Sequence, residues 1–159
     1  METPLDTPIA APAVDAFDIT MYAARDTETV LLTIGDGETP MLGADGKTQL
    51  SITVHGPASE EYAKAQAEQN NRFIARVRRK GGKVQATADD LARDAVDKLV
   101  ALTVSFNGPG FYGHMDHPGA TGKDLFRAVY ADKRIGFVKD QVAAFVDDWE
   151  NFTRTLPTT

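Results

Sequence analysis

Short stretches with strand-like patterning occupy residues 17–55 and predict a small β element. Residues 50–54 alternate strictly between apolar and hydroxyl side chains, and residues 29–34 form a short apolar run. Asp-Gly dipeptides at positions 36 and 45 predict tight turns, because glycine tolerates the positive φ that such turns require. We expect three or four short strands, the first at residues 17–22. A sheet of this size is not stable alone, so it must pack on helices or on another subunit.

Helical periodicity dominates residues 56–159 and predicts a bundle of about four helices. Thr87-x-x-Asp90 resembles a capping box, and the glycines and prolines of residues 107–120 predict a long loop. The last helix has the strongest periodicity, with a wide apolar face over about five turns. The fold class is therefore α+β, mainly α, and no internal repeat is detected. The expected helices span about residues 59–80, 87–106, 121–131 and 135–155.

The first sixteen residues and the composition of the chain lead to further predictions. Residues 1–16 contain three prolines and no periodicity, which predicts an extended or disordered arm before a β element over 17–55 and a helical domain over 56–159. The 159 residues include no cysteine and no apolar run long enough to span a membrane. A disulfide framework and a thiol nucleophile are thereby excluded, and we expect an intracellular protein without membrane association.

Charge is distributed unevenly along the chain. The net charge is −6, yet residues 62–83 carry seven cations and one acid, whereas residues 1–61 carry eleven acids and two cations. These cations could contact nucleic acid, form a solvated helix end, or pair with the acidic N-terminal region of the same or a neighbouring subunit. Because an acidic chain repels polyanions, we favour self-association in a homo-oligomer over nucleic-acid binding. The residues concerned are Arg72, Arg76, Arg78, Arg79 and Lys80.

The apolar face of the last predicted helix is a candidate binding surface. Such a face is often intramolecular core, but aromatic and aliphatic anchors at helical spacing also suit a partner helix. Both interpretations can hold if one edge of the face is buried and the other is offered to a partner. The residues are Phe137, Val138, Val142, Phe145, Trp149 and Phe152.

Candidate chemistry is confined to one loop. His114, Asp116 and His117 are residue types that bind metals, but no further histidine lies nearby in the sequence, and we interpret them as a polar loop without a metal. The sequence has no nucleophile motif, phosphate-binding loop or dinucleotide fingerprint. We therefore predict no catalytic residues, no cofactor and no enzymatic activity.

Several short segments occur in an order that is typical of one protein family. They are Asp45-Gly46-Lys47, the strand-turn-cap segment 52–62, a helix ending in Arg76-Val77-Arg78-Arg79-Lys80, the segment Leu125–Asp132, Ile135-Gly136-Phe137-Val138, and a closing Trp149-Glu150-Asn151-Phe152. Residues 45–155 thus resemble the tail assembly chaperones of long-tailed, siphovirus-type bacteriophages.

The resemblance implies a non-enzymatic morphogenesis factor in the host cytoplasm. Such a chaperone coats the long apolar tape-measure protein, keeps it soluble, and is displaced as tail-tube protein polymerises around it. Family members often also occur as a longer form made by ribosomal frameshifting. The alternative is a structural virion protein, either a head-decoration or a tail-associated component. A small metal-dependent enzyme built on the histidine loop is a third hypothesis.

Overall fold

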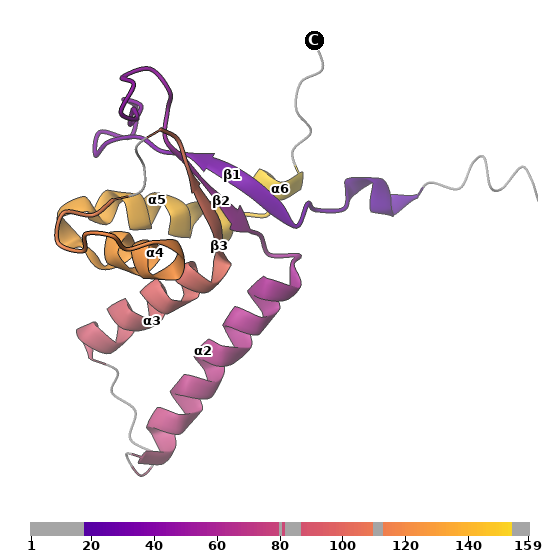
Figure 1. Cartoon of the computed structure of the whole chain (residues 1–159). Helices are drawn as coiled ribbons and strands as arrows, with labels where there is room; N and C mark the ends of the chain where they lie inside the picture. The colour runs from indigo at the N-terminus through magenta and orange to yellow at the C-terminus, as the bar shows by residue number, and fades with distance from the viewer. Residues whose placement is uncertain (1–17, 80, 82–86, 110–112, 154–159) are drawn as a thin grey trace, which may run out of the picture.

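A three-stranded antiparallel sheet lies at the centre of the structure, a computed structural model that describes residues 18–79, 81, 87–109 and 113–153 (Figure 1). The strands are β1 (Thr27–Leu31), β2 (Ser51–His55) and β3 (Thr103–Asn107), in the order β1-β2-β3. Val30 pairs with Ile52, and Ile52 pairs with Phe106, so these three apolar side chains share one buried face. The other face is mostly polar apart from the exposed Leu31, and the hydroxyls of Thr29 and Thr53 lie 3.0 Å apart on it.

Helices cover the apolar face of the sheet. They are α3 (Ala88–Leu102), α4 (Gly122–Ala131), α5 (Gly136–Val146) and α6 (Glu150–Thr153), with a 3-10 turn, η2 (Lys133–Ile135), before α5. The longest helix, α2 (Glu60–Arg79), starts after β2 and projects away from the sheet (Figure 1). The predicted class, α+β and mainly α, is confirmed.

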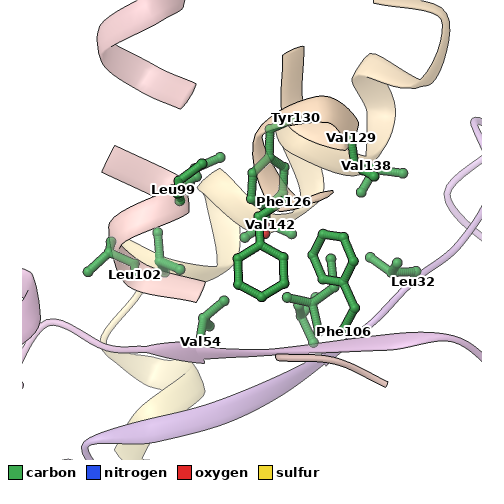
Figure 2. Packing of buried hydrophobic residues seen from close by; sticks show 14 of the residues in the cluster. Leu32, Val54, Leu99, Leu102, Phe106, Phe126, Val129, Tyr130, Val138 and Val142 are labelled. Carbon is green, nitrogen blue, oxygen red and sulfur yellow. The ribbon is translucent and has the colours of Figure 1, made fainter. Parts of the chain in front are cut away.

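Aromatic rings join β3 to the helices in the core. The ring of Phe106 lies 4.6 Å from that of Phe126 and meets Tyr130 edge-on at 5.9 Å (Figure 2). The Tyr130 hydroxyl is satisfied by that of Thr103 at 2.7 Å, and burial raises the pKa of Tyr130 above its usual value. The core therefore draws on both halves of the chain.

Two predicted elements have another secondary structure in the fold. Residues 103–107 form β3 instead of the end of a helix, because Thr103 and Val104 are β-branched and the segment pairs with β2. Phe106 fits both interpretations. It continues the helical stripe, and it also ends the segment Thr-Val-Ser-Phe, in which polar and apolar residues alternate. The segment at 17–22 is a 3-10 turn, η1 (Ile19–Tyr22), in its described part. Residues 1–16, the predicted arm, lie outside the described residues.

The predicted helix 135–155 is broken in two. Helix α5 ends at Val146 and α6 begins at Glu150, because local polar groups satisfy the backbone at the break. The Asp148 carboxylate accepts the Glu150 N–H at 2.9 Å, and the Asn151 amide donates to the Phe145 carbonyl at 3.0 Å.

A repeated hairpin connects β1 to β2, although no repeat was expected. Asp36 accepts hydrogen bonds from the Thr39 N–H and hydroxyl, and nine residues later Asp45 makes the same two bonds with Thr48. The glycine after each aspartate has positive φ, 77° and 67°. Two copies of Asp-Gly-x-Thr thus build two identical tight turns.

The two hairpins join at a ring of backbone hydrogen bonds. The Leu32 N–H donates to the Leu50 carbonyl (2.9 Å), the Leu50 N–H to the Met41 carbonyl (2.7 Å), and the Met41 N–H to the Leu32 carbonyl (3.0 Å). Leu32 is fully buried, so the ring anchors both hairpins to the core. The Gln141 side chain of α5 binds the N–H and carbonyl of Thr33 next to this ring, at 2.9 and 2.7 Å.

We expect Gly56→Ala to lower the free energy of unfolding by about 1–3 kcal/mol, because overpacking displaces buried groups. A Cβ at Gly56 would lie 2.3–2.7 Å from ring atoms of Phe152, which is fully buried. Urea denaturation measures the change. The control is Gly136→Ala, where a Cβ meets nothing within 4 Å and φ is −57°. That variant should be as stable as the wild type or more so. Equal stability of all three proteins would contradict this packing.

Candidate functional site

Helix α2 is the least covered α-helix in the described structure. Of its 20 residues only Ala65 is buried. Phe73 is 51% exposed and Ile74 47% exposed, and Val77 lies one turn further along the same side of the helix. We call Phe73, Ile74 and Val77 the α2 patch. Half-exposed large apolar side chains on a projecting helix are typical of an interaction surface.

Ion pairs, instead of apolar contacts, attach the distal half of α2 to α3. Arg76 donates to both carboxylate oxygens of Asp94, at 3.0 and 2.8 Å, and this hydrogen bonding raises the pKa of Arg76. Arg72 lies 3.6 Å from Asp94 and 3.7 Å from Asp97. Asp97 also pairs with Arg127 of α4. This charge network fixes the position of α2 against the rest of the domain.

The network changes the interpretation of the predicted basic cluster. Arg72 and Arg76 pair with α3 of the same chain, and no ion pair joins them to residues 18–61, the described part of the acidic N-terminal region. Arg78 and Arg79 are exposed, and no ion pair joins them to another described residue. Lys80 lies outside the described residues. Of the cations predicted for self-association, Arg78 and Arg79 therefore remain accessible in the described part of the chain.

The predicted apolar face of the C-terminal helix is divided by burial. Its core members are Val138, Val142 and Phe152, which are at most 1% exposed and cannot reach a partner in the folded chain. Phe137 and Phe145 are partly buried against the same core. The prediction that Val138, Val142 and Phe152 contact a partner is therefore corrected, because the sheet needs this edge of the face as its cover. Trp149, 55% exposed, is the one member that points outward.

The histidine loop is held by a closed polar cluster. His114 Nε2 lies 2.7 Å from the Asp132 carboxylate, and its Nδ1 accepts the Asp116 N–H at 3.2 Å. The Arg134 guanidinium lies between the two carboxylates, 2.6 Å from Asp116 and 2.7 Å from Asp132. These bonds hold the pKa of the Asp132 carboxyl well below its usual range.

This cluster includes the donor atoms that a metal would use. One atom each from His114, Asp116 and Asp132 lies within 4.8 Å of the others. Asp132 belongs to this set of donors although the sequence did not predict it. His117 was predicted but does not belong to the set, although its ring lies 5.1 Å from that of His114. Because Arg134 already neutralises the two carboxylates, the cluster fits a structural role that ties the loop to the start of α5.

The projection and exposure of α2 were not predicted from the sequence. In the sequence, Phe73, Ile74 and Val77 form only a thin apolar stripe, and a stripe alone does not reveal whether another element covers it. A hollow between α3, α4 and α5 was also missed, because its lining comes from segments far apart in the sequence.

We expect Asp132→Asn to lower Tm by several degrees at pH 7, because it removes the charge that pairs with Arg134. A carboxyl group with a lowered pKa in the folded state stabilises the fold above its unfolded pKa of about 3.9, and this stabilisation is lost as the pH falls. The wild type should therefore lose more Tm than Asp132→Asn between pH 7 and pH 3. Thermal melts followed by circular dichroism measure both, with the exposed Asp140→Asn as the control. Identical acid sensitivity of wild type and Asp132→Asn would contradict this role of the cluster.

None of the described helices combines the length and the apolar character needed to cross a bilayer. No family model, curated protein or solved structure matches this chain.

Proposed function

We propose that the protein is a phage tail assembly chaperone that binds the tape-measure protein in the host cytoplasm and releases it to tail-tube protein. The proposal rests on the resemblance of residues 45–155 to that family. It is supported by the exposure of the α2 patch on a helix that buries a single residue. A carrier of a long apolar helix needs apolar contact surface of its own that is not used in its core.

The charges around the α2 patch suit a reversible carrier. Arg78 adjoins the patch and is exposed, whereas Arg72 and Arg76 are partly buried and hold α2 in place through their ion pairs with α3. A partner helix that docks on Phe73 and Ile74 can therefore bind without displacing the ion pairs. A small exposed patch gives modest affinity per contact, which suits a partner that must be surrendered later.

One observation favours the alternative, a structural virion protein. The two hairpins at residues 33–49 project from the sheet and are rigidly built, as loops that lock neighbouring subunits need to be (Figure 1). Mass spectrometry of purified virions separates the two functions. A chaperone is absent from finished particles or present in traces, whereas a structural component is present in many copies.

We expect co-expression with the tape-measure protein of the same phage to raise the soluble fraction of that protein severalfold. The double variant Phe73→Asp/Ile74→Asp should abolish this effect, because two carboxylates in the patch oppose apolar docking. Lys64→Glu is the matched control, since it lies on another side of α2, is exposed, and changes the net charge by the same amount. Circular dichroism of each variant should show unchanged helicity, because these side chains are not in the core.

Two results would overturn the proposal. The first is a tape-measure protein that stays insoluble with the wild-type chain. The second is an equal rescue by the wild type and the patch variant, which would remove the α2 patch from the function.

A further inference from the structure

Trp149 is an aromatic side chain that the fold does not use. It is the single tryptophan of the chain, and it is 55% exposed at the break between α5 and α6. The break turns Phe152 into the core against Gly56 and leaves Trp149 outside. Asp147, Asp148 and Glu150 flank it in the sequence, and we call these three acids the acidic collar. Asp147 also accepts a hydrogen bond from the Tyr62 hydroxyl at 2.8 Å and lies 3.4 Å from Lys98.

An apolar hollow with a basic rim lies at the other end of α5. It has a volume of about 550 Å³ and is enclosed by α3, α4 and the start of α5. Val96 and Tyr130 are buried beneath it, and Ala131 and Gly136 add small apolar walls. We call it the α3–α5 groove. Its size is within the range of about 300–1,000 Å³ that is typical of binding sites.

The rim of the α3–α5 groove carries an excess of positive charge. Its cations are Arg93, Arg127, Lys133 and Lys139, and its acids are Asp132 and Asp140. Arg134 and His114 already engage Asp132, while Arg93 pairs with Asp90 and Arg127 with Asp97. No ion pair joins Lys133 or Lys139 to any residue of the described ranges, so both charges are available to a ligand.

We propose that Trp149 of one copy of the chain inserts into the α3–α5 groove of a second copy. The apolar floor accepts the indole, and Lys133 and Lys139 meet the acidic collar of the incoming chain. Tryptophan in a pocket, ringed by polar contacts that exclude water, is a frequent energetic centre of protein interfaces. The overall charge of −6 makes the basic groove the natural target of an acidic segment.

The contact must form between different molecules. Trp149 and the groove lie at opposite ends of α5, whose eleven residues span about 16 Å, so no molecule can fill its own groove. Two copies can exchange tryptophans in a symmetric pair, or successive copies can join head to tail into a ring or chain. The contact between Trp149 and the α3–α5 groove is the same in the symmetric pair and in the head-to-tail assembly.

The inference does not depend on the proposed function, because the purified full-length chain tests it alone. Sedimentation velocity over a wide concentration range should reveal reversible self-association. Fluorescence of the single tryptophan should shift to shorter wavelength with concentration as the indole leaves water. A chain that stays monomeric at the highest concentration, or an emission that does not move, would overturn the proposal.

Variants distinguish the two halves of the contact. Trp149→Ala should raise the dissociation constant of self-association about 30-fold or more, as expected for an interface centre. Lys133→Glu/Lys139→Glu should weaken it comparably. The control Lys64→Glu/Lys123→Glu makes the same change of charge at exposed lysines outside the groove and should assemble like the wild type.

Mixing the two defective variants gives the sharpest test. Trp149→Ala retains an intact groove, and Lys133→Glu/Lys139→Glu retains an intact Trp149. Neither should assemble alone, but together they should form a heterocomplex with a blue-shifted emission. Failure to form this heterocomplex, or a defect in the control as large as that of the groove variant, would contradict the proposed contact.

Discussion

The sheet has one apolar face that must be covered. A helix that covers this face uses its apolar side chains as core, and only the other helices keep apolar surface for a partner. Val30, Ile52 and Phe106 present it, and α3, α4 and α5 supply the opposing side chains. Burial of apolar area is the dominant favourable contribution to folding, at about 25 cal/mol per Å². The apolar residues of α5, Val138, Val142 and Val146, are therefore used as core. Surface for partners must come from helices that the sheet does not need, and α2 is the least buried of them.

The attachment of α2 follows from the same constraint. With little apolar surface turned to the domain, α2 is oriented by Arg72 and Arg76 on Asp94 and Asp97 of α3. Removing one partner of such a network is costly because Asp94 is buried and would lose its compensating charge. These ion pairs fix the direction of α2 but do not cover its other sides. The arrangement thus positions α2 while leaving Phe73 and Ile74 in water.

The sequence predicted an element correctly where its pattern fits only one kind of local structure. The strand at β2 and the capping box at Thr87 were predicted correctly because alternation and capping are local. Phe106 belonged to a helical stripe and to a strand pattern at once, and pairing with β2 decided between them. Burial of Val142 and exposure of Trp149 depended on where the chain breaks after Val146, which is set by the side chains of Asp148 and Asn151. The α3–α5 groove was beyond prediction because its walls meet only in the fold.

The α2 patch and Trp149 are separate surfaces, and their separation has a consequence for binding. If copies join through Trp149 and the α3–α5 groove, each copy still exposes its own Phe73 and Ile74. A partner with many apolar helical turns would then meet several patches held together, and each later contact would form at high effective concentration. Weak individual patches could hold a long helix firmly in this way, yet each could be released in turn. Self-association and partner binding would therefore reinforce each other without sharing a residue.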